Sequence, residues 1–231
     1  MRQVNEWIEA VAKDQTFADV GGLWGTENEK VSVASKAGAR EVTMIDITPI
    51  GSRLWQCFDE RCAAAGVSGC RRIAADINDT KQVDEIGSYE VAHCSGVLYH
   101  CPDPLHAVLN LAKLSCKVLI LGSAVVPSKI ENASGTLSIE PGSALFVPAL
   151  NESQKAVIGR HFTEVGAQEI IGITTPCQYS VNDYGPWWWL FSREYVAALL
   201  QVAGFTILAT GSDWEHRTAL YMAQNTRALG I

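Results

Sequence analysis

The sequence lacks any long apolar run. No stretch reaches the about 18 consecutive apolar residues that a membrane-spanning helix requires. The opening residues, MRQVNEWIEAVAKD, place charges among apolar positions, unlike a secretory signal peptide. Internal repeats and low-complexity tracts are absent as well. These absences predict a soluble, cytoplasmic protein that makes no contact with a membrane.

The sequence also has little positive charge. Lys and Arg number 18 against 25 Asp and Glu, which gives a formal net charge of −7 and an isoelectric point near 5.2. Nucleic-acid affinity depends on clustered Lys and Arg, so this balance disfavours a broad nucleic-acid surface. A local basic patch is the alternative, and it would draw on Arg71, Arg72, Lys113 and Lys117.

The spacing of a disulfide framework is missing. The chain has seven cysteines, an odd number scattered along a sequence that is not small. We therefore expect reduced thiols. The cysteines are Cys57, Cys62, Cys70, Cys94, Cys101, Cys116 and Cys177.

A metal-binding spacing is missing too. His93, Cys94, His100, Cys101 and His106 lie close together in the sequence. Neighbours such as His93 and Cys94 on an expected strand point to opposite faces, so they cannot both face one ion. We expect no metal, and core or pocket roles for these side chains.

Strand-like and helix-like segments alternate along the chain, which has 231 residues, 48% of them hydrophobic. This order predicts an α/β fold of the Rossmann-like kind: a mostly parallel sheet with helices on both faces and ligands beyond the carboxyl ends of the strands. The expected strands span residues 17–20, 41–46, 69–76, 89–95 and 116–123. The expected helices span residues 3–13, 27–37, 53–66 and 103–114.

The alternation stops after Val125. Residues 126–191 are rich in Gly, Pro, Ser and Asn and contain one expected helix, near residues 152–165. Such an interruption is typical of an active-site cover, so we predict a single domain over residues 1–231 in which residues 126–191 form a cap or a substrate-binding insertion. The pattern then resumes with one helix and two strands, at residues 192–205, 205–212 and 218–225.

The stretch FADVGGLWG joins an expected strand to an expected helix through a glycine-rich turn. Gly21, Gly22 and Gly25 surround Leu23 and Trp24. Glycines at the start of a helix let a ligand approach free backbone N–H groups, as nucleotide-like ligands require. The alternative is a tight connection without a ligand. The dinucleotide fingerprint G-x-G-x-x-G is absent, which disfavours an oxidoreductase.

Two acids follow the next strands of the expected sheet. Asp46 ends the second strand, where a carboxylate can accept hydrogen bonds from both hydroxyls of a ribose. Asp76 ends the third, where it can accept from an adenine amino group while Ile77 packs on the ring. The alternative role of both acids is helix capping or a solvated turn.

Four motifs together resemble those of the class I S-adenosylmethionine-dependent methyltransferases. They are ADVGGLWG, TMIDITP, AADIND and HCSGVLYHCPDP. The resemblance covers roughly residues 15–125 and the segment after residue 192. The stretches SGVLYHCPDP and GPWWWLFSREYVAALLQVAGF are similar to the branch that includes wobble-uridine tRNA methyltransferases.

The resemblance implies a seven-stranded sheet whose last strand is antiparallel, and S-adenosylmethionine as methyl donor. The sequence departs from the family's first motif at Leu23, which stands where glycine is commonest, and we expect its bulk to crowd the backbone beside the methionine part. The cofactor-binding residues that the resemblance implies are Asp19, Gly21, Gly22 and Gly25 at the methionine part, Asp46 and Ile47 at the ribose, Asp76 and Ile77 at the adenine, and Ser95 and Gly96 near the sulfonium.

Direct methyl transfer needs an aligned nucleophile and, for some acceptors, a base. His100 is the expected base, since the ordinary pKa of histidine, about 6.5, suits proton transfer at neutral pH. A structural histidine is the alternative. Tyr99, near the sulfonium end, is expected to orient the substrate.

Four aromatic residues are expected to bind substrate: Tyr184, Trp187, Trp188 and Trp189. So apolar a run would not be left exposed to solvent without a function. We interpret it as a wall of the substrate cleft, with core packing for at least one tryptophan. A partner surface is the alternative.

The predicted function is S-adenosylmethionine-dependent methyl transfer to an oxygen or nitrogen of a small or medium-sized acceptor. One alternative is a tRNA- or RNA-modifying methyltransferase. Another is a non-catalytic S-adenosylmethionine-binding protein, which only Leu23 supports. A homo-oligomer is compatible with each of these.

Overall fold

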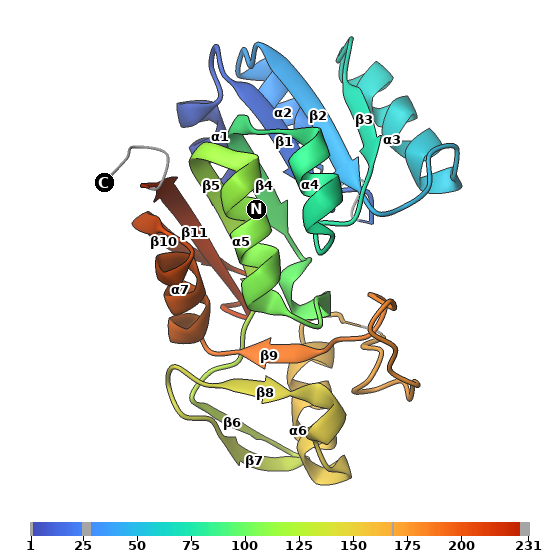
Figure 1. Cartoon of the computed structure of the whole chain (residues 1–231). Coiled ribbons are helices and arrows are strands. Elements are labelled where there is room, and N and C mark those ends of the chain that lie inside the picture. The colour runs from blue at the N-terminus through green and yellow to red at the C-terminus, as the bar shows by residue number, and fades with distance from the viewer. Residues whose placement is uncertain (1, 25–28, 168, 227–231) are drawn as a thin grey trace.

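A seven-stranded sheet forms the centre of the computed structural model, which describes residues 2–24, 29–167 and 169–226 (Figure 1). The strands lie in the order β10-β11-β5-β4-β1-β2-β3. Their bounds are β1 (Thr16–Val20), β2 (Glu41–Asp46), β3 (Arg71–Ala74), β4 (Tyr89–Ser95), β5 (Ser115–Ala124), β10 (Phe205–Asp213) and β11 (Thr218–Asn225).

Strand directions match the sequence prediction. The pairs β1–β2, β1–β4, β2–β3 and β4–β5 are parallel, whereas the last strand, β11, is antiparallel to both β5 and β10. The predicted Rossmann-like sheet with an antiparallel last strand is therefore confirmed. The carboxyl ends of the parallel strands meet at one edge, where such sheets bind ligands.

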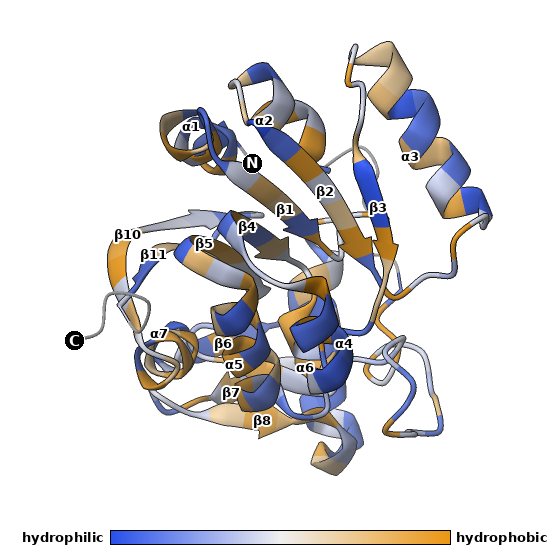
Figure 2. Ribbon diagram, turned by 45° about the horizontal axis from the view of Figure 1, so that its top comes forward, coloured by the Kyte–Doolittle hydropathy of each residue, from blue (hydrophilic) through white to orange (hydrophobic). Residues whose placement is uncertain are grey.

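Helices cover both faces of the sheet. One hydrophobic core joins the sheet to α1 (Arg2–Val11), α2 (Val31–Lys36) and α3 (Arg53–Ala64). The opposite core joins it to α4 (Thr80–Ile86), α5 (Pro104–Leu114) and α7 (Arg193–Val202). Blue and orange residues alternate around α3 and α5 in Figure 2, as expected of helices with one buried and one exposed side.

Two differences from the predicted elements have local causes. No predicted element covers α4, a helix of 7 residues. Asp79 stabilises its start, since its side chain accepts hydrogen bonds from the N–H groups of Lys81 and Gln82. The expected third strand, 69–76, is shorter in the structure: β3 spans Arg71–Ala74, and Asp76 lies in the connection that follows it. All seven cysteines are free.

Residues 126–191 fold beside the carboxyl edge of the sheet (Figure 1). The predicted helix is present, as α6 (Glu152–Thr163), and it packs with the strands on a separate apolar cluster. The strands had no alternating pattern long enough to predict them, because they span only 3 or 4 residues each. The remaining elements are β6 (Lys129–Asn132), β7 (Gly135–Ser138), β8 (Ala144–Phe146), the 3-10 helix η3 (Val147–Ala149) and β9 (Trp189–Phe191).

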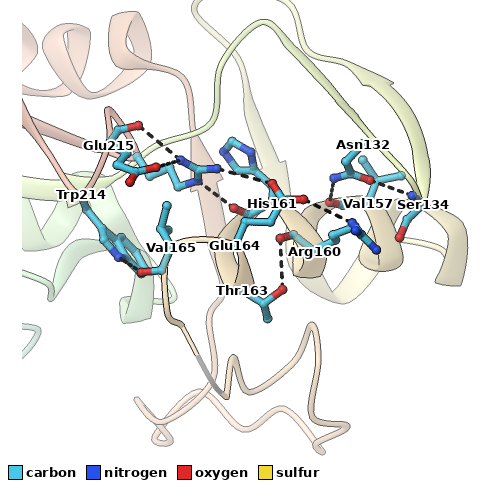
Figure 3. A network of polar contacts seen from close by, with 11 residues as sticks. Asn132, Ser134, Val157, Arg160, His161, Thr163, Glu164, Val165, Trp214 and Glu215 are labelled. Atoms are coloured by element: carbon cyan, nitrogen blue, oxygen red, sulfur yellow. Dashed lines mark hydrogen bonds and ion pairs between the residues drawn. The ribbon is translucent and has the colours of Figure 1, made fainter.

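The turn between β10 and β11 holds the end of α6 (Figure 3). Arg217 Nε donates to the carbonyl of His161 at 2.7 Å, and Trp214 Nε1 donates to the carbonyl of Val165 at 2.8 Å. These bonds satisfy carbonyls at a helix end that have no partner within the helix. The insertion is thereby fixed to the sheet. Over the described residues, no helix has the length and apolarity needed to cross a membrane.

Candidate functional site

A cavity of about 1070 Å³ opens at the carboxyl ends of the parallel strands. It brings together the glycine turn, the ends of β2, β3 and β4, and a loop of the insertion. The predicted site residues that line it are Gly21, Gly22, Asp46, Ile47, Asp76, Ile77, Ser95, Gly96, Tyr99, His100 and Tyr184.

The glycine turn requires two of its glycines. Gly21 has a φ of +75°, a left-handed conformation that other residues rarely adopt, and a Cβ there would overlap the side chain of Val97. A Cβ on Gly22 would lie 2.6 Å from Asp19 Oδ2 and 2.8 Å from Met44 Cε. Neither position therefore has space for a side chain, and both glycines line the cavity. Gly25 lies outside the described residues.

The side chain of Leu23 does not crowd the cavity, so that expectation was wrong. It is fully buried in the apolar core between the sheet and α2 and α3. Only its backbone takes part in the site, since the Leu23 N–H points to Asp46 Oδ2 at 3.3 Å. The turn directs the leucine side chain away from any ligand.

Asp46 connects the end of β2 to the glycine turn. Its Oδ1 accepts a hydrogen bond from the N–H of Thr48 at 2.9 Å, and its Oδ2 faces the N–H of Leu23. The residue is buried but lines the cavity together with Ile47. Each carboxylate oxygen can accept a second bond, so Asp46 keeps acceptor capacity for a ligand.

Asp76 is contacted by the insertion. Its Oδ1 accepts from the backbone N–H and the side-chain amide of Asn78, at 2.8 and 3.0 Å. Its Oδ2 accepts from the Tyr184 hydroxyl at 2.8 Å. Burial, and then the neighbouring Asp76 carboxylate, raise the pKa of Tyr184. On the far side, Asn110 Nδ2 donates to the carbonyl of Ile77 at 2.8 Å and so fixes the loop.

Asp19 is fully buried and does not line the cavity. Both of its oxygens are used within the protein: Oδ1 binds His93 Nδ1 and Oδ2 accepts from the N–H of Lys30, each at 2.7 Å. His93, which does line the cavity, was missed as a site residue. Its signal in the sequence was a polar side chain within the buried VAHC part of β4, and its pairing with Asp19 is seen only in the structure.

His100 and Tyr99 lie on the 3-10 helix η2 (Leu98–His100), beside Ser95 and Gly96. His100 Nδ1 contacts the carbonyl of Pro186 at 3.0 Å. Because a carbonyl only accepts, Nδ1 carries the hydrogen, and Nε2 of the neutral ring is an acceptor. Burial lowers the pKa of His100 and raises that of Tyr99 to about 12. Both rings are therefore neutral at pH 7.

None of the three tryptophans lines the cavity, so they do not form the expected substrate wall, whereas the expected core packing of at least one of them is confirmed by Trp187. Trp187 is 7% exposed and packs against Phe162 and Tyr99 in the insertion's core. Trp188, also buried, donates its backbone N–H to the carbonyl of Tyr99 at 2.8 Å. Trp187 and Trp188 precede β9. Trp187 belongs to the apolar cluster of the insertion, and the Trp188 ring packs against Phe146 and Tyr179, so both are buried despite being neighbours.

Trp189 is half-buried, and its Nε1 donates to the carbonyl of Pro102 at 3.0 Å. The indoles of Trp187 and Trp189, and the backbone N–H of Trp188, thus fix the insertion against η2 and the segment that follows it. Of the four expected aromatic contacts, Tyr184 alone lines the cavity formed by the described residues.

The cavity continues beyond the predicted residues. Lys30, Asp213, Trp214 and Thr218 line it from the start of α2 and from the turn between β10 and β11. No sequence motif indicated them, because the long-range pairing of β11 with β5 brings this turn to the site. Among the described residues, no three His, Cys, Asp or Glu side chains are placed to hold a metal ion.

Comparison with known proteins gives matches in structure only. No protein-family model and no curated protein matches the sequence. Among solved structures, magnesium protoporphyrin IX methyltransferase from Synechocystis PCC 6803, with bound S-adenosylhomocysteine, superposes with a TM-score of 0.57 at 16% identity, over 97% of this chain and 81% of the other. The chain has the Rossmann-like methyltransferase fold.

Other proteins share this methyltransferase fold. The 1,6-didemethyltoxoflavin N1-methyltransferase of Burkholderia thailandensis, with bound 1,6-didemethyltoxoflavin and S-adenosylhomocysteine, gives a TM-score of 0.56 at 14% identity over 97% of this chain and 77% of that one. A methyltransferase of Aquifex aeolicus that depends on S-adenosylmethionine gives 0.53 at 12% identity, over 97% and 88%. At these identities the likeness establishes the fold.

Proposed function

We propose that the protein transfers a methyl group from S-adenosylmethionine to an oxygen or nitrogen of a small or medium-sized acceptor. The observation that carries this proposal is the cavity, which joins the Gly21–Gly22 turn with Asp46 and Asp76 at successive strand ends. Solved proteins of the same fold hold S-adenosylmethionine or S-adenosylhomocysteine.

The residues present fit this donor. Gly21 and Gly22, which have no space for a Cβ against the protein, line the cavity and leave the backbone of the turn open to a close ligand. We assign Asp46, with Ile47 beside it, to the ribose hydroxyls, and Asp76 with Ile77 to the adenine. Ser95 and Gly96, at the end of β4, lie toward the sulfonium. The donor supplies a methyl group on positively charged sulfur, so no covalent enzyme intermediate is required.

The protein then has to align the acceptor and remove its proton. His100 suits proton acceptance, because its ring is neutral and Nε2 is the acceptor atom when Nδ1 donates to the carbonyl of Pro186. Tyr99, packed against His100 with ring centroids 4.5 Å apart, orients the acceptor. Residues 126–191 act as a cap that excludes water from the cavity.

The charge distribution favours a small acceptor over RNA. Three of the four basic residues that a nucleic-acid patch would need are paired with carboxylates: Arg72 with Asp59, Lys113 with Asp84, and Lys117 with Glu90. A tRNA acceptor, as in the wobble-uridine branch, is therefore the second candidate. The non-catalytic alternative loses its support, since Leu23 lies away from the cavity.

A transfer assay with S-[methyl-³H]adenosylmethionine tests this proposal. The purified protein is incubated with pools of small O- and N-nucleophiles and, separately, with total tRNA. Label in the small-molecule fraction, abolished by excess S-adenosylhomocysteine, is the expected result. Label in tRNA would overturn the acceptor class, and tight donor binding without transfer to either pool would overturn catalysis.

A further inference from the structure

Asp19 and His93 form a buried pair across two neighbouring strands. They are register partners on β1 and β4, and Asp19 Oδ1 lies 2.7 Å from His93 Nδ1. Asp19 is 0% exposed and His93 5% exposed, but His93 also lines the cavity. Asp19, the acid of the first motif, therefore does not reach the cavity. His93 is the member of the pair that does.

The pairing determines which atom of the histidine remains for a ligand. A carboxylate only accepts, so His93 Nδ1 carries the hydrogen, and the neutral ring has a lone pair at Nε2. No hydrogen bond between described residues uses His93 Nε2. Asp19 Oδ2 already accepts from the N–H of Lys30, so Asp19 holds the ring from a fixed position.

Charges of both signs surround this part of the cavity. Lys30 and Asp213 line it, and the carboxylates of Asp19, Glu29 and Asp213 act on the Lys30 ammonium. Burial lowers the pKa of Lys30 and these carboxylates oppose that change. A free amino acid group carries an α-carboxylate and an α-ammonium. The Lys30 ammonium can pair with the first, and the Asp213 carboxylate and the His93 imidazole can accept from the second.

We propose that His93, positioned by Asp19, binds the amino-acid end of the methyl donor. Its Nε2 accepts a hydrogen bond from the donor's α-ammonium, and Lys30 lies toward the α-carboxylate. This inference rests on the proposed function, and it moves the direct contact that the sequence motif suggested for Asp19 to His93. Asp19 is then a positioning residue.

Two ligands that differ only at this end test the inference. S-adenosylhomocysteine carries the amino-acid group, whereas 5′-methylthioadenosine keeps the nucleoside and sulfur but lacks it. Calorimetric titrations with both are run on the wild type and on His93→Asn, which keeps an N–H for Asp19 and removes Nε2. We expect S-adenosylhomocysteine to bind roughly tenfold to hundredfold more weakly, and methylthioadenosine to bind within about twofold of the wild type.

His161→Asn is the matched control, because His161 lies at the junction of α6 and does not line the cavity. If His93→Asn bound both ligands more weakly by the same factor, or bound both as the wild type does, the role of His93 would be overturned. Failure of the wild type to bind either ligand would instead overturn the proposed function.

A second measurement uses the wild type only, so it does not depend on whether His93→Asn folds. The imidazole ¹⁵N resonances are recorded with each ligand. The inference predicts that S-adenosylhomocysteine shifts the His93 Nε2 signal and that methylthioadenosine leaves it in place. The same small shift with both ligands would contradict it.

Discussion

Tyr184 occupies the carboxylate that we assign to the adenine. Its hydroxyl donates to Asp76 Oδ2 at 2.8 Å, while Asn78 occupies Oδ1. An adenine amino group would use the same carboxylate, and the hydroxyl already takes one of the acceptor positions of Oδ2, so ligand and hydroxyl compete for that position. The aromatic ring can still cover the base after the hydroxyl leaves. We therefore expect the Tyr184 hydroxyl to lower the affinity of the cavity for the donor.

Tyr184→Phe is expected to bind S-adenosylhomocysteine about threefold to tenfold more tightly, because the variant removes the competing hydrogen bond and keeps the ring. Calorimetry measures the change. Tyr179→Phe is the matched control, since the Tyr179 hydroxyl donates to the carbonyl of Trp187 in the same insertion and does not line the cavity. Weaker binding of Tyr184→Phe would show that the hydroxyl supports the ligand.

His100 gives a prediction about pH. Burial lowers its pKa below the ordinary 6.5, and only the neutral ring can accept a proton. The rate constant kcat should therefore be constant near pH 7 and fall as the pH decreases through a value below 6.5. His100→Asn should lower kcat about 10²- to 10⁴-fold and remove this acidic limb. An unchanged limb in the variant would assign His100 a structural role only.

At the scale of elements, one arginine joins the insertion to the sheet. Arg217 on the β10–β11 turn donates to the carbonyl of His161, and its guanidinium lies 3.9 Å from Glu164 and 3.6 Å from Glu215 (Figure 3). Its side chain is only 12% exposed. The junction therefore depends on a mostly buried charge with several acceptors, unlike an exposed ion pair.

Arg217→Met keeps the aliphatic stem and removes the donors. We expect the free energy of unfolding to fall by about 1–3 kcal/mol, because the His161 carbonyl loses its partner. Urea denaturation measures this. Arg160→Met is the control: Arg160 forms an exposed pair with Glu164, worth less than about 0.5 kcal/mol. Equal losses in both variants would contradict the special role of Arg217.

His161 adds a pH dependence at the same junction. Burial, and then the charge of Arg217, lower its pKa to about 4 from the ordinary 6.5. Between these values the unfolded chain binds a proton that the folded chain does not, so stability should decrease as the pH falls from 6.5 to 4. In His161→Phe this part of the decrease should disappear from melting temperatures recorded against pH. An unchanged pH profile would show that other groups cause it.

For the whole molecule, the sequence predicts the sheet well because strand and helix periods are local properties. The 41–46 and 89–95 strands match β2 and β4 residue for residue, and the acids and glycines at strand ends converge in one cavity. Parallel strands place their carboxyl ends together whatever the rest of the chain does.

What the sequence did not predict depends on contacts between distant residues. The role of His93 required the pairing of β1 with β4, and burial of Trp187 and Trp188 required packing within the insertion and against η2. The side-chain direction of Leu23 depended on the turn geometry. None of these follows from the periodicity of a short window.

The central claim is that this cavity binds S-adenosylmethionine, and a calorimetric titration of the whole chain tests it most directly. The wild type should bind S-adenosylmethionine and S-adenosylhomocysteine with Kd on the order of micromolar. Asp46→Ala should bind at least about thirtyfold more weakly, since it loses two ribose hydrogen bonds. Asp84→Ala, which removes an exposed partner of Lys113 outside the cavity, should bind as the wild type does. Absence of binding to the wild type, or equal affinity in Asp46→Ala, would contradict the account.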